Sequence, residues 1–184
     1  CRTLIQPAER KRIDLIMALP DPLAEQVLRI ARLAGDKIMA IYEKDFAIYE
    51  KQDTSPLTEA DLAAHNVIVS ELESISDLPV LSEESADISW EERKTWQQYW
   101  LVDPLDGTKS FIEGSNDFVV CIALINNRSP ILGCIAHPPT QKVWIGGKNI
   151  GSYVKLPKSN IRKIYCRDIP IRGPTIATSR HHVG

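Results

Sequence analysis

The chain has 184 residues, of which 43% are hydrophobic and 25% are charged, and its formal net charge is −2. This composition is typical of a folded globular protein rather than a disordered one. The small net charge gives no bulk electrostatic reason to expect a nucleic-acid polymer or a membrane surface as partner. No apolar run reaches the length of a membrane span, so we expect no integral membrane segment.

The four cysteines are Cys1, Cys121, Cys134 and Cys166. They form no C-x-x-C pair and no zinc-like grouping. Because Cys121 and Cys134 lie inside apolar runs, we expect buried, reduced thiols, which fits a cytoplasmic protein.

The N-terminal part of the chain predicts an extension followed by helices. We expect residues 1–20 to be an N-terminal extension without regular structure, with Met17 as a natural start. Asp21-Pro22 is typical of an N-cap followed by a first-turn proline, and apolar residues at helical spacing predict a helix to about Tyr42. Residues 47–51 favour a short strand. A second helix is predicted from Thr58 to about Ser74, with an apolar face marked by Leu62, His65, Val69 and Leu72.

The remainder of the chain is rich in predicted strands. Residues 78–81 are a short apolar run, and residues 86–98 favour a helical excursion on the surface. Strands are predicted at 99–102, ending at Asp103-Pro104, and at 118–125, 131–136, 142–145 and 175–178. Short turns between strands imply antiparallel pairing. The predicted fold class is α+β, with two N-terminal helices packed on a largely antiparallel sheet.

The hexapeptide Asp103-Pro104-Leu105-Asp106-Gly107-Thr108 carries the strongest chemical signal. Pro104 and Gly107 predict a sharp turn. If that turn is helix-like, the β-carbons of Asp103 and Asp106 lie about 5–6 Å apart, and the carboxylates repel unless a cation lies between them. Magnesium prefers such oxygen ligands, and the Leu105 carbonyl offers another. Backbone N–H groups after Gly107 could hold a phosphate. The alternative is a surface turn that caps a helix beginning near Thr108.

Two further carboxylates are candidates. Glu83 follows the short apolar run and could complete a metal shell, although an acidic pair in a loop is more often a solvated surface. Asp61 stands three residues after Thr58, as in a capping box. It could also act with the Thr108 hydroxyl to orient and deprotonate an attacking water. These two interpretations of Asp61 do not exclude each other.

Four segments, in this order, resemble the inositol monophosphatase superfamily of magnesium-dependent, lithium-sensitive phosphatases. They are S-P-L-T-E-A-D (55–61), L-S-E-E-S (81–85), W-L-V-D-P-L-D-G-T-K-S-F-I (100–112) and S-R-H-H (179–182). The lysine after D-P-L-D-G-T, the following Phe-Ile and the late Ser-Arg-x-His are most similar to the 3'(2'),5'-bisphosphate nucleotidase branch. The resemblance extends from about Leu23 to Val183.

The resemblance implies a role for each motif residue. Two or three Mg²⁺ ions would be bound by Glu83, Asp103, the Leu105 carbonyl and Asp106, with Asp103 bridging two of them. Asp61 and Thr108 would be catalytic. The substrate would be bound by Glu83, Leu105, Asp106, Gly107, Thr108 and Ser179, and Arg180 and His182 would approach the nucleotide. The implied reaction converts adenosine 3',5'-bisphosphate to AMP and phosphate, a clearance step in sulfate assimilation. The alternative substrate is inositol monophosphate or a related sugar phosphate.

The chain departs from the family in one respect. The family carries another metal-ligand aspartate in a W-D-x-A-A motif, whereas none of the tryptophans here is followed by aspartate. The implied organisation is therefore a metal-binding α+β domain at 21–170 and the start of a truncated second domain at 171–184. A sheet without its second covering layer would expose apolar surface and invite homo-oligomer formation. A non-catalytic metal-binding remnant is the alternative to an active phosphatase.

Overall fold

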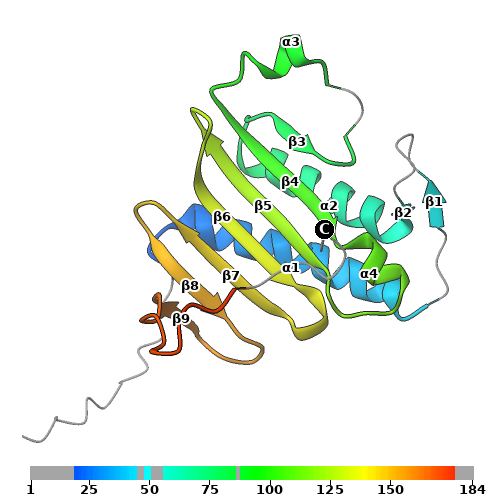
Figure 1. Ribbon diagram of the computed structural model, residues 1–184. Coiled ribbons are helices and arrows are strands. Elements are labelled where there is room, and N and C mark those ends of the chain that lie inside the picture. The colour runs from blue at the N-terminus through cyan, green and yellow to red at the C-terminus, as the bar shows by residue number, and fades with distance from the viewer. Residues whose placement is uncertain (1–18, 45–47, 51–55, 86–87, 177–184) are drawn as a thin grey trace, which may run out of the picture.

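A computed structural model describes residues 19–44, 48–50, 56–85 and 88–176 of the chain. Within these residues two long helices cover one face of a seven-stranded sheet (Figure 1). The predicted α+β class is therefore confirmed. Residues 19–20 and 171–176 are the only described parts of the predicted N-terminal extension and of the predicted second-domain start.

Helices α1 (Pro22–Tyr42) and α2 (Glu59–Ile75) agree with the predicted spans. Asp21 caps α1 by accepting hydrogen bonds from the Leu23 and Ala24 backbone N–H groups at 2.8 and 3.4 Å. The predicted apolar face of α2 is wrong in part, because Leu62 is 38% exposed. The buried residues of α2 are Ala60, Asp61, Ala64, Ile68 and Leu72. The small alanine side chains let this face of α2 pack closely.

The strands of the large sheet follow one another in chain order. They are β3 (Val80–Ser82), β4 (Gln98–Asp106), β5 (Val119–Asn126), β6 (Ser129–His137), β7 (Lys142–Gly147), β8 (Gly151–Lys155) and β9 (Ile161–Ile164). β3 and β4 are parallel, and the other neighbours are antiparallel. β1 (Ile48–Glu50) and β2 (Pro56–Thr58) form a separate antiparallel pair. The 3₁₀ turn η1 (Pro138–Thr140) joins β6 to β7.

Three strand predictions need correction. β4 does not end at Asp103-Pro104 but continues to Asp106. β8 and β9 were not predicted, since their short sequences, G-S-Y-V-K and I-R-K-I, lack a clear alternating pattern. Thr175 and Ile176 are not in a strand, and residues 177–178 of that prediction lie outside the described residues.

The two faces of the seven-stranded sheet are covered to different extents by the helices. Val102, Ile122, Cys134 and Ile145 form a cross-strand row on the helix-covered face and are at most 3% exposed. The adjacent row, Asp103, Cys121, Ile135 and Trp144, lies on the opposite face because successive side chains alternate. Ile135 is 45% exposed and Trp144 is 37% exposed. We call this second side the open face, and neither α1 nor α2 covers it (Figure 1).

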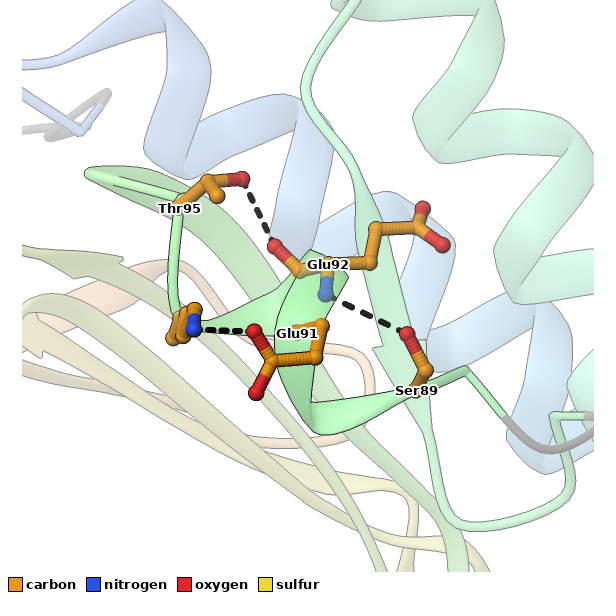
Figure 2. A network of polar contacts seen from close by, with 5 residues as sticks. Ser89, Glu91, Glu92 and Thr95 are labelled. Carbon is orange, nitrogen blue, oxygen red and sulfur yellow. Dashed lines mark hydrogen bonds and ion pairs between the residues drawn. The ribbon is translucent and has the colours of Figure 1, made fainter.

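The predicted surface excursion contains one short helix, α3 (Trp90–Arg93). The Ser89 hydroxyl accepts a hydrogen bond from the Glu92 N–H at 3.2 Å, and the Thr95 hydroxyl donates to the Glu92 carbonyl at 2.7 Å (Figure 2). Lys94 also forms an ion pair with Glu91. These local bonds compensate for a helix with no buried residue. None of the helices in the described ranges is long and apolar enough to cross a membrane.

Candidate metal-dependent active site

A bulge in β4 brings the two aspartates of the hexapeptide to one face. Asp103 pairs with Cys121 and Asp106 pairs with Val119, so three steps along β4 correspond to two steps along β5. The extra residue restores Asp106 to the same face as Asp103, which an unbroken strand would prevent. The register shift also accommodates Pro104, which has no N–H for the ladder. The turn is a β-bulge and not the helix-like turn considered from the sequence, and the two carboxylates lie on one side in this geometry as well.

Parallel pairing of β3 with β4 brings Glu83 to the same place. Ser82 is aligned with Val102, and the Glu83 N–H donates to the Val102 carbonyl at 3.0 Å. Glu83, just past the end of β3, therefore lies beside Asp103, which is the next residue after Val102 in β4. A linear sequence gives no signal for this neighbourhood, because residues 86–98 intervene.

The three carboxylates interact strongly. Burial and the negative charges of Glu83 and Asp106 raise the pKa of Asp103 from 3.8 to about 7, although the Leu105 N–H, 3.2 Å from Asp103 Oδ1, opposes the rise. A side-chain hydrogen bond with Glu83 also favours the protonated form of Asp103. A proton on Asp103 thus relieves part of the repulsion among the three carboxylates, as a bound cation would also do.

Asp61 joins a second part of the site. Its Oδ2 accepts hydrogen bonds from the Thr58 N–H at 2.8 Å and the Thr58 hydroxyl at 2.5 Å, which completes a capping box at the start of α2. Its Oδ1 accepts from the Thr108 hydroxyl at 3.1 Å. Asp61 is only 1% exposed. These contacts show Asp61 as a capping residue that also contacts Thr108, and its role in deprotonating an attacking water stays a prediction.

The Thr108 hydroxyl has a second acceptor, because the Leu105 carbonyl also lies 3.1 Å away. Thr108 thus links the buried Asp61 to the backbone of the bulge. It begins the short helix α4 (Thr108–Ile112) immediately after Gly107, which has a φ of 98°. Tyr42, Phe111 and Phe118 pack with ring centroids 5.0–5.2 Å apart and hold α4 against α1 and the start of β5.

The donor set fits a hard divalent cation. Carboxylate oxygens and a backbone carbonyl are the ligands that magnesium prefers, and the raised pKa of Asp103 indicates negative charge without sufficient compensation. Within the described residues, however, no three His, Cys, Asp or Glu side chains enclose a common point where an ion would sit. Ser179, Arg180 and His182 lie outside the described residues.

A groove of about 580 Å³ extends from these carboxylates along the open face. Its apolar lining includes Leu101, Ala123 and Ile135, and Arg93 supplies a cation. Among the described residues, the buried Nε of Arg93 has no hydrogen-bond partner. Burial and the charges of Asp103 and Asp106 raise the pKa of Cys121 to about 12, so its thiol stays protonated beside the cluster. Sequence reasoning missed Arg93 and Cys121 as residues of this site. Cys121 reaches it through the pairing of β5 with β4, and Arg93 reaches it from the short helix α3.

Comparisons with known proteins agree with this fold. The family model of the inositol monophosphatase family matches residues 19–182, and the chain belongs to that family. The chain is 44% identical over 163 residues to the 3'(2'),5'-bisphosphate nucleotidase CysQ of Salmonella typhimurium, which covers 87% of this chain and 64% of the relative. The corresponding protein of Escherichia coli K12 is 43% identical over the same length. The chain thus spans about 64% of the length of these curated relatives.

Solved structures give the same result. CysQ from Bacteroides thetaiotaomicron, described as a bacterial member of the inositol monophosphatase family, matches with a TM-score of 0.64 at 34% identity, covering 86% of this chain and 59% of that one. The extragenic suppressor protein suhB from Bartonella henselae matches with a TM-score of 0.65 at 25% identity, covering 76% and 54%. The resemblance predicted from the motifs is confirmed. These relatives lend no support to the alternative of a non-catalytic remnant.

Proposed function

We propose that this protein supplies the site of a magnesium-dependent phosphate-monoester hydrolase, which converts adenosine 3',5'-bisphosphate to AMP and phosphate. The observation that carries the proposal is the hydrogen bond from the Thr108 hydroxyl to the buried Asp61, at the edge of a cluster of three carboxylates. The named activity of the CysQ relatives supports the choice of substrate.

The proposed roles follow from the contacts. Glu83, Asp103, Asp106 and the Leu105 carbonyl would hold magnesium, which, when bound, supplies positive charge near the phosphate oxygens and makes water more acidic. Because Thr108 donates its hydroxyl hydrogen to Asp61, its oxygen lone pairs can accept a hydrogen bond from water. Asp61 would take the proton through Thr108 as the water oxygen attacks phosphorus. The P–O ester bond breaks, and the departing ribose oxygen acquires a proton from solvent.

The groove favours a substrate with two phosphates over one with a single phosphate. One phosphate would lie at the carboxylate cluster, and Arg93 lines the same groove with a guanidinium suited to a second phosphate. The test compares phosphate release from adenosine 3',5'-bisphosphate and from inositol monophosphate, with magnesium and with or without lithium. Faster release from inositol monophosphate would overturn the substrate assignment and leave the phosphatase assignment standing.

Asp61→Asn is expected to lower kcat by about 10²–10⁴-fold, because the amide cannot accept a proton at neutral pH. The amide oxygen can still accept the Thr58 N–H, so the melting temperature should fall little. Steady-state phosphate release and thermal denaturation check both parts. A variant that retains wild-type kcat would remove Asp61 from the proposed mechanism.

The open face gives a prediction about self-association. Since Ile135 and Trp144 are exposed apolar neighbours, the pair Ile135→Thr and Trp144→Thr should lower the sedimentation coefficient of any oligomer that forms. Leu62→Gln is the control, because Leu62 is exposed on a helix away from this face. An oligomer unaffected by the paired change would exclude the open face as its interface.

The cytoplasmic location expected from reduced cysteines stays a prediction.

A further inference from the structure

His65 lies one helical turn after Asp61, so both side chains project from the same side of α2. Asp61 contacts Thr108 at the end of the β4 bulge. His65 Nδ1 lies 2.8 Å from the Ser82 hydroxyl, at the end of β3. One side of α2 therefore reaches both chain segments that carry the candidate metal ligands.

Ser82 is the anchor of the turn that presents Glu83. Its hydroxyl accepts a hydrogen bond from the Glu84 N–H at 3.4 Å, and its N–H donates to the Ser85 hydroxyl at 3.2 Å. The Ser85 N–H closes the turn onto the Ser82 carbonyl at 3.0 Å. Ser82 is only 5% exposed, whereas the Glu83 side chain between these bonds is exposed.

The hydrogen bond between His65 Nδ1 and the Ser82 hydroxyl can run in either direction, depending on the tautomer of His65. Because the Ser82 oxygen accepts from the Glu84 N–H, its own hydrogen is available to donate to His65 Nδ1. With this direction His65 is neutral and carries its hydrogen on Nε2. With the opposite direction, Nδ1–H donates to the second lone pair of the Ser82 oxygen, and the link between the two side chains is the same. Burial lowers the pKa of His65, which is consistent with a neutral ring.

We propose that His65 is a positioning residue, which holds the turn of residues 82–85 through the Ser82 hydroxyl and so keeps Glu83 beside Asp103. The proposal rests on the function proposed above for that cluster. A metal-ligand side chain that is already held in place, as Glu83 would be, loses less conformational freedom when the ion binds. Loss of a residue that positions a metal ligand typically lowers the affinity for the metal about 10- to 100-fold.

The test uses His65→Leu and Ser82→Ala, alone and together, in the full chain. His65→Asn is the rescue variant, because its amide oxygen can accept near the position of Nδ1. Asn66→Ala, at an exposed position on the same helix, is the control. The measurements are amide hydrogen exchange without metal, thermal denaturation, and calorimetric titration with Mg²⁺.

His65→Leu should speed exchange of the Glu84 and Ser85 amides while leaving the middle of α2 protected. Mg²⁺ affinity should fall about 10- to 100-fold, the double variant should lose no more than the single ones, and His65→Asn should recover most of the loss. Unchanged exchange at residues 83–85, or equal effects from Asn66→Ala, would overturn the role of His65. If the unaltered chain binds no Mg²⁺, the proposed function fails, and the exchange data still decide whether His65 holds the turn.

Discussion

Asp103→Asn is expected to weaken Mg²⁺ binding by more than the roughly 10- to 100-fold that follows loss of an outer partner. The reason is that Asp103 occupies the centre of the cluster, with Glu83 and Asp106 both acting on its pKa. The neutral amide removes one of few anionic oxygens and leaves the other two without their shared neighbour. Phosphate release should fall to background. Calorimetric titration with Mg²⁺ measures the first effect and a phosphate assay the second.

The same substitution should stabilise the metal-free protein at neutral pH. The pKa of Asp103 is raised from 3.8 to about 7 by folding, so the folded chain binds the proton more tightly than the unfolded chain does. The charged form of Asp103 therefore destabilises the folded chain. This effect is absent below about pH 4, where the carboxyl is protonated in both states, grows as pH rises, and is complete above about pH 7. Asparagine carries no such charge. The melting temperature of Asp103→Asn minus that of the unaltered chain should therefore increase between pH 4 and pH 7 in a chelator.

Glu113→Gln is the control for this pair of effects, since Glu113 is an exposed carboxylate at the end of α4. It should change neither Mg²⁺ affinity nor the pH dependence of melting. If the melting temperature of Asp103→Asn differs from that of the unaltered chain by the same amount at every pH from 4 to 7, the negative charge of Asp103 does not destabilise the fold. Unweakened Mg²⁺ binding by Asp103→Asn would remove this residue from the metal site.

Gly107→Ala is expected to destabilise the fold by roughly 2–5 kcal/mol. Gly107 has a φ of 98°, which is unfavourable for a residue with a β-carbon. A β-carbon here would also lie 2.6 Å from the Asp117 carbonyl oxygen and 3.2 Å from the Phe118 Cα, which are backbone atoms at the entry to β5. The chain must shift to admit it, and the shift falls between Asp106 and Thr108. Denaturant unfolding gives the free energy, and activity should fall further than stability alone explains.

Gly114→Ala separates the two causes. Gly114 also has a positive φ, of 72°, but a β-carbon there meets no atom within 4 Å. Only the conformational effect remains, about 1–2 kcal/mol. Equal destabilisation by both substitutions would mean that the close approach of Asp117 to Gly107 has no energetic consequence.

The local pattern of capping residues and apolar spacing was sufficient to predict the two long helices and most strands of the sheet. Asp21-Pro22 and the helical spacing of apolar residues predicted α1, and the Thr58 capping box predicted where α2 begins. These signals act within one helical turn, so they can be read along the chain. The apolar face of α2 could not be read in this way, because Ala60 and Ala64 are weak hydrophobic signals that become important only when the helix packs.

The sequence by itself was sufficient to indicate the family, which the family comparison confirms, and to name Asp61, Glu83, Asp103, Asp106 and Thr108 as the candidate site residues. Only the tertiary structure decided how they meet. A β-bulge, rather than a helical turn, aligns Asp103 with Asp106, and parallel pairing of β3 with β4 brings Glu83 alongside. The link from His65 to Ser82 has the same origin. Strand register and helix packing are set by contacts between distant residues, and no local spacing encodes them.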